Sequence, residues 1–109
     1  MTEIIIRKSE NGEYKGFTCK GHSGFAAKGK DIVCASVSVL VINAINSMEK
    51  LAEEDMEIKA EEVAGIIRCR IKRTLSEKGK LLMDSMILGL LQIEEQYGNK
   101  YLVVKFKEV

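Results

Sequence analysis

His22 and Cys34 are the residues of this sequence whose types best suit nucleophilic chemistry. His22 is the chain's single histidine, and it lies twelve residues before Cys34. An imidazole within hydrogen-bonding reach of a thiol can take its proton and later give a proton to a leaving amine. A single cysteine in an apolar segment is nevertheless more often a core residue, and a loop histidine is more often a surface residue. The pair is therefore a hypothesis that depends on the elements around it.

A helix start next to Cys34 favours the catalytic interpretation. Asp31 is a good N-cap residue, and the apolar run over 32–51 predicts a central helix that is buried on nearly every face. Cys34 then falls in the first turn, where free backbone amides and the helix dipole favour a thiolate. The same amides could stabilise an oxyanion. Ser38, one turn farther on, could reach the thiol or its substrate, or instead bond back to the carbonyl of Cys34.

The segment 21–30, which contains His22 and precedes Cys34, is predicted to be a loop. It contains Gly21, Gly24 and Gly29, which could let the loop open for a peptide and close over it, or could simply serve turns. Phe25 could contact a substrate or anchor the loop in the core.

The flanking elements follow from periodicity and turn residues. Strands are expected at 2–8 and 14–20 around the hairpin signal Asn11-Gly12, and also at 56–62, 66–73 and 101–107. A second helix is expected to start at Ser76 and to end at Gly98. Residues 1–109 are then a single α/β domain of two layers, a mixed β-sheet with two helices in the order β-β-α-β-β-α-β.

The second helix carries more apolar residues than one sheet face needs. One apolar stripe is expected to consist of Leu82, Met86, Ile93 and Tyr97. It is expected to be widened by Leu81, Leu88 and Leu91. Part of this surface could face a second subunit.

Composition excludes several other classes of protein. The net charge of +1 predicts neither nucleic acid nor membrane as a partner. The apolar stretch 32–45 is expected to be too short to span a bilayer, and the N-terminus does not have the pattern of a signal peptide. We therefore expect a cytoplasmic protein, whose thiols stay reduced.

The remaining cysteines, Cys19 and Cys69, are interpreted as small core residues. Three cysteines without close spacing and a single histidine predict neither a disulfide framework nor a zinc site, and no cofactor is expected. Because Cys19 lies only three residues before His22, a role for it in the active site stays open.

The stretch 21–40 resembles the signature of the ribosomal-processing cysteine protease family, Prp. The matching features are Gly21-His22, a loop of small residues, a glycine two residues before Asp-Ile-Val-Cys, and a following Val-Ser. Ser23 and Ser36 stand where alanine is expected, which exchanges one small residue for another. Chain length and element order are also similar to that family.

The resemblance implies a function and a set of site residues. His22 would be the base, Cys34 the nucleophile, and Asp31 and Ser38 supporting residues, with Asp31 also capping the helix. The family removes the N-terminal extension of the twenty-seventh protein of the large ribosomal subunit, and it cleaves after a pair of phenylalanines. Its members are homodimers, so the expected partners are this extension peptide and a second copy of the chain.

Two other functions are compatible with the sequence. One is a non-catalytic module of ribosome assembly, whose working surface would be the basic row Arg68, Arg70, Lys72 and Arg73. This row could contact the extension peptide or ribosomal RNA, although a solvated sheet face explains it more simply. The other is a different thiol chemistry, such as acyl transfer or redox sensing, and the lack of a resolving cysteine nearby disfavours the redox version.

Overall fold

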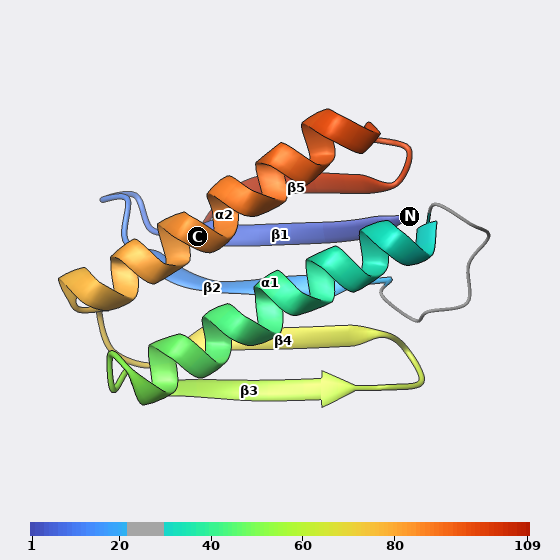
Figure 1. Cartoon of the computed structure of the whole chain (residues 1–109). Helices are drawn as coiled ribbons and strands as arrows, with labels where there is room; N and C mark the ends of the chain where they lie inside the picture. The colour runs from blue at the N-terminus through green and yellow to red at the C-terminus, as the bar shows by residue number, and fades with distance from the viewer. Residues whose placement is uncertain (22–29) are drawn as a thin grey trace.

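The computed structural model describes residues 1–21 and 30–109, with Lys30 and Asp31 described by their backbone alone. In this part of the chain the elements are β1 (Thr2–Lys8), β2 (Tyr14–Lys20), α1 (Lys30–Lys50), β3 (Met56–Glu61), β4 (Ile66–Ile71), α2 (Glu77–Tyr97) and β5 (Leu102–Glu108). The described strands form a five-stranded sheet in the order β3-β4-β2-β1-β5. Figure 1 shows α1 and α2 together on one face of this sheet. The predicted two-layer α/β fold and its element order are confirmed.

The sheet is mixed because β1 has neighbours of opposite sense. It pairs antiparallel with β2 and parallel with β5, whereas β4 pairs antiparallel with both β2 and β3. The hairpin between β1 and β2 turns at Asn11-Gly12, as predicted, and the Gly12 amide donates to the Ser9 carbonyl at 2.9 Å. A β-bulge between Arg7 and Lys8 then shifts the register of the two strands by one residue.

The core lies between the sheet and the helices. The buried side chains of α1 recur at three- and four-residue intervals, from Val33 and Val37 through Val41 to Met48. The prediction that this helix is buried on nearly every face is wrong, because Ile32, Val39 and Ile42 are 58%, 67% and 47% exposed. The sheet covers only one side of α1 and α2 only another, so a third side remains open.

The apolar character of α1 also corrects the expectation about its length. The helical segment Ile32–Lys50 has 19 residues and a mean hydropathy of 1.6, which is long and apolar enough for a membrane-spanning helix. About a third of this segment is buried inside the protein, at 33% of the apolar window.

The helix α2 starts as predicted. Ser76 is its N-cap, and the Ser76 hydroxyl accepts a hydrogen bond from the Gly79 amide at 3.2 Å. The predicted apolar stripe is confirmed in part, since Met86 is buried and Leu82 and Ile93 are partly buried against the core. The other residues buried on the core side are Gly79, Met83, Ile87 and Leu90. Tyr97 is 38% exposed.

Candidate active site

Cys34 lies near the start of α1 with its thiol partly exposed. Its Sγ atom is 3.6 Å from the hydroxyl oxygen of Thr2, and either atom can be the donor. The same Sγ is 3.9 Å from the backbone carbonyl oxygen of Gly21, to which the thiol can donate. The Thr2 hydroxyl in turn lies 3.4 Å from this carbonyl oxygen as a donor. The thiol is thus in contact with the start of β1 and with the residue that follows β2.

The register of the first hairpin brings Thr2 and Gly21 together. Glu3 pairs with Lys20, so the residue before one lies beside the residue after the other. Thr2 is 1% exposed and shares the core-facing side of β1 with Ile4. Because α1 packs on this side of the sheet, its first turns lie over this end of the hairpin (Figure 1). The sequence interpretation missed Thr2, because its place beside Gly21 depends on the register of the two strands, which the sequence analysis did not predict.

Gly21 has a fixed position that the loop interpretation did not anticipate. Its φ angle is +87°, and a Cβ atom here would lie only 2.5 Å from the carbonyl oxygen of Met1. Its amide donates to the carbonyl of Gly65 at 2.9 Å. A residue with a side chain would therefore be strained here by both conformation and contact, and glycine allows the carbonyl to face Cys34.

The helix start differs from the predicted one. Because α1 begins at Lys30, Asp31 lies inside the first turn and is not the residue that precedes it. Cys34 is the fifth residue of the described helix, so the helix amides that lack an intrahelical partner belong to residues before it. Helical side chains point toward the N-terminus, so Sγ still lies over the turn that carries those amides.

The other predicted site residues have different outcomes. Ser38 is partly exposed one turn beyond Cys34, and the back-bond considered for it is found at Ser36 instead, whose hydroxyl donates to the Ile32 carbonyl at 2.8 Å. Four predicted residues lie outside the described ones, namely His22, Gly24, Phe25 and Gly29.

Cys19 and Cys69 are buried, with exposures of 0% and 1%. Burial raises the pKa of the Cys19 thiol to about 12, and a negative charge on Cys34 would act in the same direction. Burial likewise raises the pKa of the Cys69 thiol to about 12, against an opposing effect of Arg7. Both thiols stay neutral near neutral pH, which confirms their interpretation as core residues and leaves Cys34 as the accessible thiol of the described chain.

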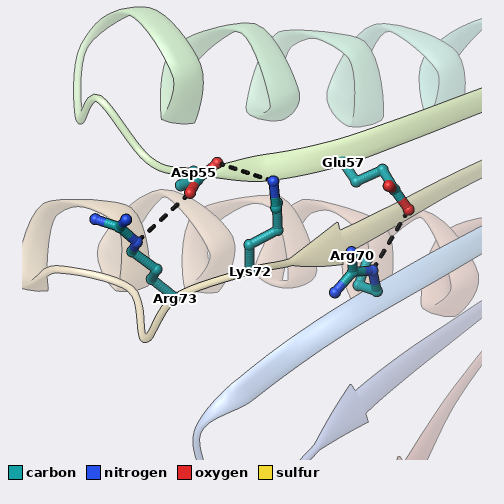
Figure 2. Close-up of polar contacts among 5 residues, drawn as sticks. All are labelled: Asp55, Glu57, Arg70, Lys72 and Arg73. Atoms are coloured by element: carbon teal, nitrogen blue, oxygen red, sulfur yellow. Dashed lines mark hydrogen bonds and ion pairs between the residues drawn. The ribbon is translucent and has the colours of Figure 1, made fainter.

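The basic row, which begins on β4 with Arg68 and Arg70 and continues just after it with Lys72 and Arg73, is paired with acidic residues. Arg68 contacts Glu61 at 3.1 Å, and Arg70 contacts Glu57 at 3.4 Å. Figure 2 shows the latter pair and Asp55 between Lys72 and Arg73, at 3.9 and 3.6 Å. The hydrogen bond from Arg70 holds the pKa of Glu57 below its usual value. These contacts favour the solvated sheet face over a binding surface for ribosomal RNA.

The residues described do not contain a cluster of three or more histidine, cysteine and acidic side chains that could hold a metal ion. An accessible thiol over the N-terminal turn of a helix is the arrangement of a thiol-dependent enzyme. The sequence profile of the family described as cysteine protease Prp matches residues 1–102. The chain belongs to this family, and it is a cysteine peptidase.

Similar proteins agree with this assignment. A ribosomal processing cysteine protease Prp from Bacillus subtilis (strain 168) is 32% identical over 101 residues, which are 89% of this chain and 90% of the relative. The one from Staphylococcus aureus (strain Mu50 / ATCC 700699) is 26% identical over 98 residues, 90% of this chain and 92% of the relative.

Solved structures of the same protease are also similar. The crystal structure of the S. aureus ribosomal processing protease Prp in complex with a substrate peptide has a TM-score of 0.91 at 25% identity, covering 98% of this chain and 100% of that one. The form with a covalently linked product peptide has a TM-score of 0.87 at 26% identity over the same shares.

Proposed function

We propose that this chain is an endopeptidase that removes the N-terminal extension of a ribosomal protein, with Cys34 as the nucleophile and His22 as the general base. The Cys34 sulfur would attack the scissile carbonyl carbon as the imidazole takes the thiol proton. The imidazolium would then protonate the leaving amine as the C–N bond breaks, and water would hydrolyse the thioester. Asp31 and Ser38 would be supporting residues, and the free amides at the start of α1 would stabilise the oxyanion.

The position of Gly21 is the observation that carries this assignment. Its carbonyl oxygen lies 3.9 Å from the Cys34 sulfur, and Gly21 is bonded directly to His22. The only histidine of the chain is thus joined to a residue that contacts the only accessible thiol of the described chain. Gly24, Phe25 and Gly29 belong to the segment that follows His22, and they would contact the peptide.

The substrate we propose is the extension of the twenty-seventh protein of the large ribosomal subunit, cleaved after a pair of phenylalanines. The relatives named as ribosomal processing proteases, and the S. aureus structure with a substrate peptide, support a peptide of a ribosomal protein as the substrate. We further propose that residues 1–109 act as one protease domain in the cytoplasm.

A homodimer is proposed as the working form. Exposed apolar side chains on the open sides of the helices support it, among them Val39 at 67% on α1 and Leu88 at 59% on α2. Apolar side chains gathered on one surface are typical of subunit contacts. Sedimentation equilibrium would measure the association, and Leu88→Lys is expected to shift it toward the monomer.

Cleavage of a model peptide tests the proposed function. A peptide containing Asn-Leu-Gln-Phe-Phe-Ala is incubated with the native protein, with Cys34→Ser and with Ser36→Ala, and the products are identified by mass spectrometry. Ser36 is the matched control because its hydroxyl bonds to the Ile32 carbonyl. We expect a cut after the second phenylalanine by the native protein and by Ser36→Ala. Cleavage by Cys34→Ser, or an intact peptide with the folded native protein, would contradict the proposal.

A further inference from the structure

Thr2 places a buried hydroxyl against the proposed nucleophile. The residue is 1% exposed, so its hydroxyl has little access to water. Within reach of this hydroxyl are the Gly21 carbonyl oxygen at 3.4 Å and the Cys34 sulfur at 3.6 Å. A buried hydroxyl has a single proton to donate, so it can serve only one of these two acceptors at a time.

The protonation state of Cys34 decides which acceptor receives the proton. While Cys34 is a neutral thiol, both the thiol and the Thr2 hydroxyl can donate to the Gly21 carbonyl, which has two lone pairs. Once the thiol is deprotonated, the sulfur is an anion and needs a donor. The Gly21 carbonyl cannot donate, whereas the Thr2 hydroxyl can turn about its Cβ–Oγ1 bond toward the sulfur. A hydrogen bond to an ionised group is stronger than one between neutral groups.

The hydroxyl is held in place from both sides of β1. The Thr2 amide donates to the carbonyl of Tyr101 at 2.9 Å, and Thr2 pairs in register with Leu102 of β5. On the other side, the antiparallel pairing with β2 fixes the position of Gly21. Threonine is also restricted at χ1 by its branched Cβ atom. Turning the hydroxyl from carbonyl to sulfur therefore needs only the rotation of one proton.

We infer that Thr2 is a positioning residue that stabilises the thiolate of Cys34 by donating a hydrogen bond to its sulfur. This inference rests on the proposed function, since it assumes that the thiolate of Cys34 is the reactive species. A hydrogen bond to the charged form of a thiol favours ionisation, so the thiolate forms at lower pH.

The test measures the thiolate itself and does not require peptide cleavage. The rate of iodoacetamide modification at Cys34 is followed by mass spectrometry as a function of pH in the native protein, Thr2→Val and Thr2→Ser. Valine keeps the shape of threonine without the hydroxyl, and serine keeps the hydroxyl. We expect Thr2→Val to slow modification of Cys34 about tenfold at neutral pH, because the sulfur loses a donor that stabilises its ionised form. Thr2→Ser should stay close to the native curve, and the rates of all three proteins should converge at high pH.

Several outcomes distinguish this inference from the proposed function. Ser36→Ala removes a hydroxyl from α1, the helix that carries Cys34. It is expected to leave the pH dependence of Cys34 modification unchanged, because the Ser36 hydroxyl donates to the Ile32 carbonyl. If Thr2→Val does not fold, as judged by circular dichroism, Thr2→Ala provides the same comparison with a smaller side chain. Superimposable titrations of the native protein and the folded hydroxyl-free variant would overturn the role of Thr2. An intact peptide together with a shifted titration would overturn the protease substrate and leave the role of Thr2 standing.

Discussion

Replacing Gly21 by alanine should destabilise the end of the sheet that supports the thiol. The φ angle of +87° is a left-handed conformation, which costs an L-residue about 1–2 kcal/mol. The new Cβ would also lie 2.5 Å from the Met1 carbonyl oxygen and 3.4 Å from its carbon. These are backbone atoms of the residue before β1, so relief requires a backbone shift, and overpacking of this kind costs about 1–3 kcal/mol. We expect Gly21→Ala to lower the free energy of unfolding by about 2–5 kcal/mol.

Gly12→Ala is a matched control for this change. Gly12 has a similar φ angle of +83°, but no atom lies within 4 Å of the position of its Cβ. It should therefore lose only the conformational part, about 1–2 kcal/mol. The difference between the two variants isolates the clash at Met1.

Urea unfolding followed by far-ultraviolet circular dichroism measures both losses. A small protein has a slope of about 1–3 kcal/mol per molar urea, so a loss of several kcal/mol moves the midpoint by a molar unit or more. Modification of Cys34 by iodoacetamide should change in Gly21→Ala, because the Gly21 carbonyl beside the sulfur must move, and should not change in Gly12→Ala. Equal losses of stability in the two variants would contradict a clash at Met1.

Four further predictions concern the cysteines, the start of α2 and the charges at the sheet edge. Iodoacetamide should modify Cys34 in the folded protein and reach the buried Cys19 and Cys69 only after unfolding, so equal labelling of all three would show that the described core is open. Glu54→Ala should lower the free energy of unfolding by about 1 kcal/mol, because its carboxylate accepts from the Ser76 amide at 3.0 Å and from the Ser76 hydroxyl at 2.7 Å. The Cβ of Gly79→Ala would overlap the Glu54 carboxylate. Gly79→Ala should therefore lower the free energy of unfolding less in the Glu54→Ala background than in the native protein, and additive losses in urea unfolding would contradict the overlap. The hydrogen bond from Lys105 is the largest cause that holds the pKa of Glu3 below its ordinary value of 4.5. A carboxylate whose pKa is lower in the folded state stabilises the fold at pH values above its unfolded pKa. This stabilisation should therefore be lost as the pH falls below 4.5 and through the folded pKa of Glu3. Glu3→Gln should flatten the dependence of the urea midpoint on pH, and Glu10→Gln is the control.

Local patterns in the sequence were sufficient for most of the fold. The first two strands have the predicted bounds because the β-branched residues of β1 precede a strong turn signal, and Ser76 caps α2 as its side-chain type indicated. The sides of the helices were harder to predict. In α1 apolar residues occupy every side, so the sequence did not indicate which side the sheet would cover. Ile42 and Val41 are equally apolar, and only the packing of α1 against the sheet and α2 decides that Val41 is buried and Ile42 half exposed.

The candidate site was predicted in part for a similar reason. Cys34 was singled out because a thiol near a helix start has recognisable chemistry, whatever its tertiary contacts. Thr2 could not be found in this way, because a threonine that begins a strand is ordinary. Its place beside Gly21 depends on a one-residue bulge, and its place beside Cys34 depends on where α1 crosses the sheet. Both are outcomes of packing between segments far apart in the sequence.

The parallel pairing of β1 with β5 has a consequence for how the protein folds. Thr2 pairs with Leu102, which is 100 positions later in the chain. Contacts between such distant residues form late, because a large loop must close before they are made. Until β5 docks, one edge of β1 is unpaired and the Thr2 amide lacks its acceptor on Tyr101. The surroundings of the thiol are therefore completed at the end of folding, so a partly synthesised chain should carry an unactivated cysteine and gain its full reactivity only once residues 101–108 are in place.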